Sequence, residues 1–286
     1  MPGQIIPYPE RQLKAMINFK MGSIFSRKIG PGQQATEQEP DNQVLAVWGS
    51  PSSGKTLVSV KLAKHLASKR KNVALLLCDM TAPPLPCICP PSDIECEKSL
   101  GSILAATHVT DNLIKQNCVL HKKQSYVTMI GMLKGENVFT YPPYTAEQAV
   151  ELIEHLRNIA PYVIIDCGST IATDILSAVS LMESDAVLRL VNCDLKSISY
   201  LSSQLPLLMD QKWDADKQYK IASNVKQYEA KENMEQILNG VTFTIPHSEE
   251  VEQQYLSGDL FKDLGLKDSK GFRKELEKIS KEVFGI

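Results

Sequence analysis

The sequence predicts a doubly wound α/β domain with a mainly parallel sheet and helices on both faces, preceded by an N-terminal arm. Three observations predict this fold. Short runs of Val, Ile and Leu alternate with segments of helical periodicity, which is typical of a parallel sheet buried between helix layers. A glycine-containing loop joins the first such run to the first helical segment. An apolar content of 43% in 286 residues is enough for one large core.

Residues 1–42 differ from the rest of the chain and predict an arm and linker. Residues 11–28 mix apolar and basic side chains, and Gly30-Pro31-Gly32 opens a stretch rich in Gln, Glu and Pro. That composition is typical of a flexible linker. The arm is either a partly ordered tail or an amphipathic patch for a membrane or partner. We place the globular domain at residues 43–286.

Strands and helices are expected to alternate through this domain. We expect strands at residues 44–49, 73–79, 126–132, 162–167, 186–192, 219–224 and 241–245. We expect helices at residues 55–69, 145–159, 196–209, 231–238 and 270–284. In the last helix, apolar residues recur at helical spacing from Phe272 to Val283, so one face should be apolar.

Charge, hydropathy and cysteine content narrow the function classes. The formal net charge is -2, so any contact with DNA must come from a local basic patch. No apolar run approaches the length of a membrane span, which is about 18 residues. The first 20 residues lack the layout of a signal peptide. Together with seven cysteines, an odd number that favours reduced thiols, these features predict a cytoplasmic protein.

The loop between the first strand and the first helix, Gly49 to Thr56, reads GSPSSGKT. This is a P-loop, or Walker A motif, in the strand–loop–helix context that the motif requires. Glycines let successive backbone N–H groups turn toward phosphate, and the helix N-terminus adds partial positive charge. We expect Lys55 to contact the β- and γ-phosphates of ATP and the Thr56 hydroxyl to bind Mg²⁺. The other candidate cofactor-binding residues of this segment are Gly49, Ser50, Ser52, Ser53, Gly54 and Leu57.

Two apolar strands end in a carboxylate, Asp79 at the end of the second strand and Asp166 near the end of the strand at 162–167. The carboxyl ends of parallel strands lie at one edge of the sheet, so both residues should lie near the phosphates. We therefore assign Asp79 and Asp166, with Thr56, as Mg²⁺ ligands. With Lys55 they form the candidate catalytic set. For each aspartate the alternative is a turn cap at the end of a strand.

These motifs together resemble the MinD/ParA family of P-loop ATPases, which includes the TadZ/CpaE pilus-localisation branch. The resemblance runs from about residue 44 to about residue 261. The segment at 118–210 is also similar to ParA-like proteins of conjugative elements. The family resemblance implies that Asp79 lies in switch I and helps to orient the attacking water, and that Asp166 lies in switch II.

The resemblance also implies an adenine site late in the chain. Asn224 occupies the position of an asparagine that reads the adenine edge, and Pro246 belongs to a loop that packs on the base. One position departs from the family pattern. Members usually carry a signature Lys after the first Walker A glycine, where this chain has Ser50, followed by Pro51 in place of a glycine. A hydroxyl cannot supply that positive charge to the transition state. We therefore expect slow hydrolysis that Ser50→Lys would accelerate.

The implied function is a nucleotide-switched homodimer that binds ATP and Mg²⁺ and positions a partner. The partner would belong to a DNA-partition, pilus or conjugation system, and the dimer could also contact DNA non-specifically or a membrane surface. The first alternative is a scaffold that holds ATP without hydrolysing it. A second alternative is an iron–sulfur or other metal carrier, suggested by a loop with several cysteines at 87–96. The basic C-terminal helix could bind membrane or DNA, or could simply dock on the sheet.

Overall fold

The computed structural model describes residues 43–94, 98–208, 213–226 and 238–286. The expected arm at 1–42 lies outside these residues, and so does the expected helix at 231–238 apart from its last residue. Both therefore stay predictions.

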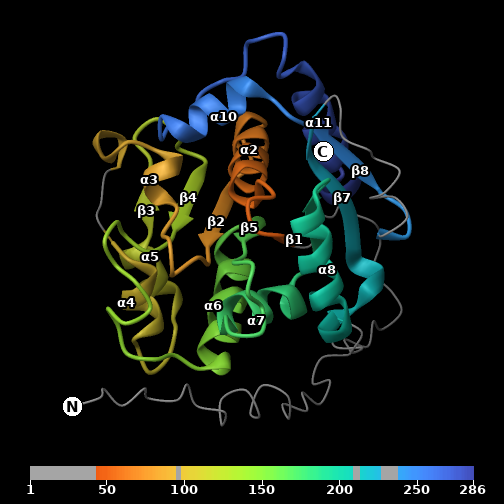
Figure 1. The fold of residues 1–286 in the computed structure, drawn as a ribbon. Coiled ribbons are helices and arrows are strands. Elements are labelled where there is room, and N and C mark those ends of the chain that lie inside the picture. The colour runs from red at the N-terminus through yellow and green to blue at the C-terminus, as the bar shows by residue number, and fades with distance from the viewer. Residues whose placement is uncertain (1–42, 95–97, 209–212, 227–237) are drawn as a thin grey trace, which may run out of the picture. The chain divides into compact units, whose positions relative to one another are not determined.

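The described residues form an eight-stranded sheet in the order β3-β4-β2-β5-β1-β6-β7-β8 (Figure 1). The strands are β1 Gln43–Gly49, β2 Val73–Leu77, β3 Val119–Leu120, β4 Val127–Ile130, β5 Tyr162–Asp166, β6 Ala186–Asn192, β7 Gln218–Val225 and β8 Phe243–Pro246. Every neighbouring pair is parallel except β3 and β4, which are antiparallel. The mainly parallel sheet is confirmed, and all seven expected strands form within two residues of their expected ends.

Helices cover both faces of this sheet. They are α2 Lys55–Ser68, α3 Leu85–Ile88, α4 Leu100–Leu104, α5 Asp111–Asn117, α6 Ala146–Ile159, α7 Ile175–Glu183, α8 Leu195–Leu208, α10 Glu249–Leu256 and α11 Lys270–Phe284. Helices α2 and α11 lie on one face, and α6, α7 and α8 lie on the other (Figure 1). Within the described residues, no helix is both long enough and apolar enough to cross a bilayer.

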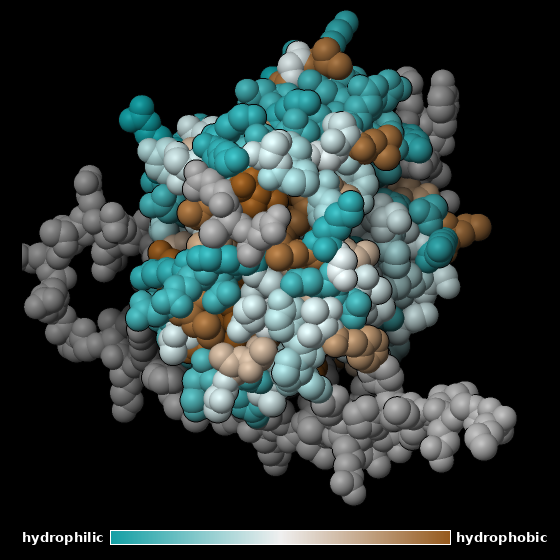
Figure 2. All heavy atoms as spheres, turned by 90° about the vertical axis from the view of Figure 1, so that its left-hand side faces the viewer, coloured by the Kyte–Doolittle hydropathy of each residue, from teal (hydrophilic) through white to brown (hydrophobic). Residues whose placement is uncertain are grey.

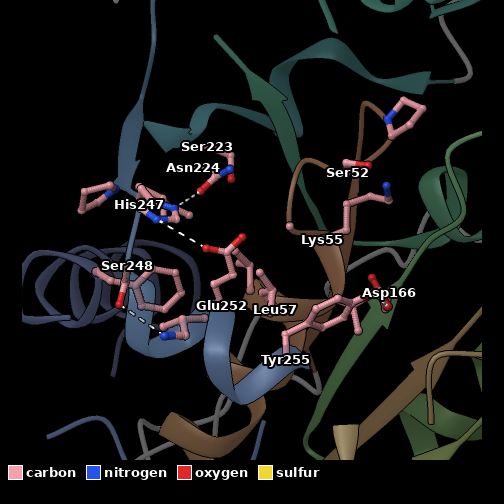
Figure 3. A pocket seen from close by; sticks show the side chains of 18 of the residues that line it. Ser52, Lys55, Leu57, Asp166, Ser223, Asn224, His247, Ser248, Glu252 and Tyr255 are labelled. Carbon is pink, nitrogen blue, oxygen red and sulfur yellow. Dashed lines mark hydrogen bonds and ion pairs between the residues drawn. The ribbon is translucent and has the colours of Figure 1, made fainter. Parts of the chain in front are cut away.

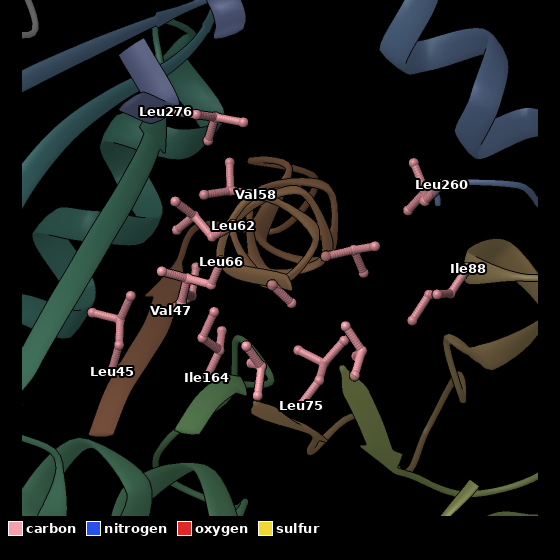
Figure 4. Close-up of a cluster of buried hydrophobic side chains, with 14 of the residues drawn as sticks. Leu45, Val47, Val58, Leu62, Leu66, Leu75, Ile88, Ile164, Leu260 and Leu276 are labelled. Atoms are coloured by element: carbon pink, nitrogen blue, oxygen red, sulfur yellow. The ribbon is translucent and has the colours of Figure 1, made fainter. Parts of the chain in front are cut away.

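The main core lies between the sheet and the helix that follows the P-loop. Val58, Leu62 and Leu66 of α2 are at most 1% exposed, and Figure 4 shows them over Leu45 and Val47 of β1. Alternate residues of each central strand face this helix, and the intervening residues face the opposite layer, as the two-residue period of a strand requires. Because α2 is fixed along its length, the loop before it is held at the carboxyl end of β1.

The C-terminal helix α11 docks on the same layer. Its apolar residues Phe272, Leu276, Ile279 and Phe284 are buried, and it packs against α2 and β8. The Phe284 ring meets the Tyr162 ring edge-on, with the ring centroids 5.6 Å apart. The apolar stripe is therefore part of the core, which favours the docked interpretation of this helix over insertion of that face into a membrane.

Candidate nucleotide-binding site

The P-loop connects β1 to α2 through two residues in left-handed conformation. Ser52 has φ 60° and Gly54 has φ 81°, a backbone conformation that turns neighbouring N–H groups toward one side. Helix α2 begins at Lys55, and Gly54 before it provides no side-chain cap. The N–H groups of the first helical turn have no partner within their own helix. A helix start of this kind is suited to bind an anion.

The base of the loop is buried against β6 and α8. A Cβ at Gly49 would lie 1.8 Å from the Leu190 carbonyl oxygen, so only glycine fits at this crossing. The Ser50 hydroxyl donates a 3.1 Å hydrogen bond to the Ser197 hydroxyl on α8. The Ser53 hydroxyl is buried and has no hydrogen-bond partner among the described residues. Of the residues expected to bind cofactor, Gly49, Ser50 and Ser53 are thus buried in the base of the loop.

Lys55 reaches across the loop to the segment after β5. Its Nζ donates to the Ser50 carbonyl oxygen at 3.2 Å and to the Ser169 hydroxyl at 2.7 Å. Burial lowers the pKa of Lys55 below its usual value, and the negative charges of Asp166 and Asp79 partly oppose that shift. The ammonium is therefore poorly solvated, which favours binding of an anion beside it.

Thr56 and Asp166 meet at the same edge of the sheet. The Thr56 hydroxyl donates a 2.6 Å hydrogen bond to Asp166 Oδ2. Ser59 Oγ donates to Oδ1 of the same carboxylate at 3.5 Å. We expected Asp166 at an exposed strand end, but the residue is only 3% exposed, because α2 covers the end of β5. Burial raises the pKa of Asp166 to about 6, and the hydrogen bond from Thr56 and the charge of Lys55 lower it in part.

Asp79 combines the two roles that the sequence left open. Its Oδ1 accepts hydrogen bonds from the N–H groups of Thr81 and Ala82, at 2.9 and 2.8 Å, so it caps the turn after β2. It also lines the cavity that contains Lys55 and Asp166. The turn therefore holds the carboxylate at the phosphate end of the site.

A cavity of about 550 Å³ extends from the P-loop toward β8 and α10 (Figure 3). Its phosphate end contains Ser52, Lys55, Thr56, Asp79 and Asp166. Its other end contains Leu57, Asn224, Pro246, His247 and Phe272. The structure thus brings Asn224 and Pro246, predicted 168 or more positions after Thr56, into one cavity with the P-loop.

The far end of the cavity combines apolar side chains with a small polar group. Asn224 has φ 55° and lies at an irregularity of the β7–β8 ladder between Ala222 and Val225. Its Oδ1 lies 2.8 Å from His247 Nδ1, and His247 Nε2 lies 3.7 Å from Glu252 Oε2. Apolar walls with a few placed polar groups are suited to a flat heterocycle.

Three residues that the sequence analysis did not single out support the phosphate end. Ser169 accepts the hydrogen bond from Lys55, and its carbonyl oxygen accepts from Tyr200 on α8. Tyr255 on α10 lines the cavity opposite the P-loop. Ser169 follows Asp166 closely and could have been proposed from that proximity. Tyr200 and Tyr255 carry no local signal, because only tertiary packing brings them to the site.

The donor set at the phosphate end fits Mg²⁺ bound together with a nucleotide. Mg²⁺ commonly takes one or two carboxylates, with phosphate oxygens and water completing its shell. Asp166 and Asp79 supply carboxylates, and the Thr56 hydroxyl already contacts Asp166. A cation here would also offset the unfavourable burial of the Asp166 charge. We find no group of three or more His, Cys, Asp or Glu side chains placed to hold a metal among the described residues.

The described cysteines of the expected metal site do not come together at a common point. Cys89 is buried in the main core, whereas Cys87 on α3 is partly exposed. Cys118 donates to the Lys115 carbonyl oxygen at 3.3 Å, and His121 packs its ring against Phe261 with centroids 5.0 Å apart. Cys96, the remaining member of the expected cluster, lies outside the described residues. The described thiols therefore give no support to a metal carrier.

Comparison with known proteins finds the same arrangement in solved structures. No family model matches the sequence, and no curated protein matches it. A ParA family ATPase from Chlorobium tepidum superimposes with a TM-score of 0.66 at 15% identity, covering 84% of this chain and 98% of that one. The fold is that of the MinD and ParA ATPases.

Two further structures carry nucleotide on the MinD/ParA fold. The septum site-determining protein MinD from Pyrococcus horikoshii, complexed with Mg-ADP, has a TM-score of 0.65 at 15% identity over 85% of this chain and 96% of that one. An ATP complex of a variant McdA from Cyanothece has a TM-score of 0.61 at 18% identity over 86% and 97%. These superpositions establish the shared fold. At identities of 15–18% they carry no argument about the ligand or the function, which rests on the residues of this chain.

Proposed function

We propose that this protein binds Mg²⁺-ATP in the cavity and works as a nucleotide switch of MinD/ParA type. The observation that carries the proposal is the phosphate end of the cavity, where Lys55, Thr56 and Asp166 meet beside the uncapped start of α2. Cation, hydroxyl, carboxylate and free backbone N–H groups are the donor and acceptor types that a triphosphate with Mg²⁺ needs. The far end, where apolar side chains surround the Asn224 amide and its polar neighbours, supports a purine as the remaining part of the ligand.

Each residue has a distinct role in this proposal. Lys55 releases its contact to Ser169 and binds β- and γ-phosphate oxygens, while the first N–H groups of α2 bind the same phosphates. Thr56 and Asp166 hold Mg²⁺, directly or through water, and the bound ion neutralises charge on the phosphates. Asp79, held in place by its turn, orients the attacking water. Asn224 pairs with the adenine edge, and Pro246 packs on the ring.

Slow hydrolysis is part of the proposal. Among the described residues that line the cavity, Lys55 is the one Lys or Arg side chain. A transferring phosphoryl group spreads negative charge over its oxygens, and a second cation there can raise the rate by about 10³–10⁵. With Ser50 buried against Ser197, position 50 supplies no such cation. We propose that two subunits close on ATP and that slow turnover reopens them.

The partner is proposed from the exposed side of α11. The exposed side of this helix carries the basic residues Lys270, Arg273, Lys274, Lys278 and Lys281 beside the acidic Glu277 and Glu282. Lys278 also pairs with Glu275. The excess of cations is suited to phosphate groups of DNA, without sequence preference. We propose non-specific DNA as one partner, alongside a protein of a partition, pilus or conjugation system. Binding of a random duplex that weakens steeply with salt would support the DNA contact.

The test of the central proposal is calorimetric titration with ATP, with and without Mg²⁺, followed by steady-state phosphate release. We expect tight binding that requires Mg²⁺, and turnover well below the range of about 1–100 per second found for kinases. A protein that binds no nucleotide would contradict the proposal. Turnover within the kinase range would contradict its slow-switch part alone.

A scaffold that holds ATP without hydrolysing it is the second candidate, and the Ser50–Ser197 contact favours it. This contact fixes the base of the loop to α8, so the loop is held in place to bind a phosphate. Single-turnover measurement over hours separates the two candidates. The scaffold retains intact ATP, whereas the switch converts bound ATP to ADP.

A further inference from the structure

The junction between β7 and β8 places one histidine beside the amide at the far end of the cavity. At the irregularity of the ladder, Asn224 leaves the regular strand conformation, and Val225 resumes pairing with Pro246. The His247 N–H then donates to the Val225 carbonyl oxygen at 2.9 Å. Two strand ends that are distant in sequence are thus tied together at the cavity wall.

The residues on both sides of His247 in the sequence are held in place. Pro246, before it, packs closely on α11, where a Cβ at Gly271 would lie 3.1 Å from Pro246 Cγ. Ser248, after it, caps α10 by accepting from the Val251 N–H and donates to Asp268 Oδ2 at 2.9 Å. The His247 side chain therefore projects from a fixed backbone position.

Contact between His247 and Asn224 determines which way the amide faces. Asn224 Oδ1 lies 2.8 Å from His247 Nδ1, as the dashed line in Figure 3 marks. An amide oxygen only accepts hydrogen bonds, so His247 must present its Nδ1–H here. In the tautomer with Nδ1–H, the bond distinguishes the oxygen of the amide from its nitrogen, because an Nδ2–H₂ group in the same place would face another donor.

We propose that His247 is a positioning residue that makes the cavity selective for adenine over guanine by fixing the Asn224 amide. This inference rests on the proposed nucleotide function. Adenine presents an amino donor where guanine presents a carbonyl acceptor at the same ring position. A freely turning amide can match either base by exchanging its oxygen and nitrogen. An amide fixed by His247 matches one base, and the other base meets it with two donors or two acceptors opposed.

Replacing the ring donor while keeping the ring tests this inference. His247→Phe removes both nitrogen atoms at similar volume, and His247→Gln keeps a donor that can reach the amide oxygen. For each variant, calorimetry in Mg²⁺ gives the Kd of ATP, GTP and inorganic tripolyphosphate. Tripolyphosphate reports the phosphate end alone. His108→Phe is the matched control, since His108 is exposed and does not line the cavity.

We expect His247→Phe to reduce the preference for ATP over GTP by about tenfold, equivalent to about 1.4 kcal/mol. His247→Gln should keep more of the preference for ATP, and His108→Phe should keep all of it, while every variant binds tripolyphosphate like the wild type. A preference unchanged in His247→Phe would overturn the inference. An equal loss of affinity for ATP, GTP and tripolyphosphate would also overturn it, because that result would indicate that His247 has a structural role. A wild-type protein that binds neither ATP nor tripolyphosphate would instead overturn the proposed function itself.

Discussion

The Ser50 hydroxyl donates to the Ser197 hydroxyl at 3.1 Å, and this bond joins the P-loop to the first turn of α8. Ser197 in turn donates through its hydroxyl to Asp194 Oδ2 at 3.2 Å and through its N–H to Oδ1 at 2.8 Å. Ser50 has no exposed surface. The side chain at this position, where MinD/ParA proteins usually carry a signature lysine, is therefore directed into the contact between the loop and α8.

This contact changes what Ser50→Lys should do. The sequence alone led us to expect faster hydrolysis, but a lysine at a fully buried position must bury its ammonium or displace α8. We now expect the single variant to lose about 1–3 kcal/mol of stability in urea unfolding and to stay slow in phosphate release. Ser50→Lys with Ser197→Gly, which makes room beside the loop, should release phosphate faster than either single variant.

Ser50→Ala is the control for loss of the hydroxyl alone, and it should cost about 0.5–1.5 kcal/mol. A Ser50→Lys protein as stable as the wild type, with raised turnover, would show that the lysine leaves the α8 contact without help.

Lys55 is expected to supply most of the charge that holds the phosphates. Lys55→Ala should weaken ATP binding by more than tenfold, since a hydrogen bond to a charged group contributes about 1.5–3 kcal/mol. Lys69→Ala, at an exposed residue directly after the same helix, should bind ATP like the wild type. Isothermal calorimetry measures both. An unchanged Kd in Lys55→Ala would show that phosphate is not bound at this end of the cavity.

Asp166→Asn should separate Mg²⁺ binding from stability. The folded pKa, about 6, lies above the reference value of 3.8. The ionised carboxylate therefore destabilises the apo protein above about pH 6, and this effect disappears as the pH falls toward 4. We expect Asp166→Asn to raise apo stability at pH 7.5 by up to about 3 kcal/mol and to remove the Mg²⁺ dependence of ATP binding.

Urea unfolding without ligand and calorimetry with and without Mg²⁺ measure the two effects of Asp166→Asn. Asparagine keeps an acceptor for the Thr56 hydroxyl, so the variant should fold. An asparagine variant that is less stable than the wild type would identify Asp166 as a structural cap.

The regular part of the fold follows from local sequence patterns. Helix α6 is one example, because Thr145 and Gln148 form a capping box at the predicted start and Leu152 and Leu156 lie on the buried face. The seven expected strands owe their prediction to continuous apolar runs. The antiparallel strand β3 was missed because two residues carry no periodicity, and α10 was missed because most of its residues are Glu or Gln, which leaves no apolar stripe.

Part of the candidate site is likewise predictable from local sequence, and the rest depends on tertiary packing. Gly54, Lys55 and Thr56 are recognisable because the motif is contiguous and each residue type has a fixed task. The burial of Asp166 depends on how α2 crosses the end of β5, and no local pattern encodes that crossing. The contact between Ser50 and Ser197 spans 147 positions. Packing of the whole sheet decides such contacts, so they appear only in the structure.

Helix α11 is expected to contribute to stability, since its apolar face is part of the core. Ile279 is fully buried in the main core, so Ile279→Ala should cost about 2–5 kcal/mol in urea unfolding. Lys281→Ala, on the exposed side of the same helix, should cost less than about 0.5 kcal/mol. Equal stability of Ile279→Ala and the wild type would show that α11 detaches from the domain and could present its apolar face to a membrane.

A buried lysine between α2 and α10 should make stability depend on pH. Lys61 is 3% exposed. Its Nζ donates to the Lys262 carbonyl oxygen at 3.0 Å and also to Gln254 Oε1 on α10. Burial lowers the pKa of Lys61 from 10.5 to about 7, and the charge of Lys64 adds to this shift. Above about pH 7 the folded protein therefore holds fewer protons at this site than the unfolded chain does.

The contribution of Lys61 to the free energy of unfolding should consequently rise with pH, by about 1.4 kcal/mol per pH unit between about pH 7 and pH 10. Urea unfolding at pH 7, 8 and 9 measures the slope for the wild type and for Lys61→Met, which keeps most of the side-chain volume without the ammonium. We expect the slope to be shallower in Lys61→Met than in the wild type, and Lys69→Met, at an exposed site after the same helix, to keep the wild-type slope. If Lys61→Met and the wild type have the same slope, Lys61 stays charged in the folded protein and its contacts to Gln254 and Lys262 hold α10 against α2 as charged hydrogen bonds.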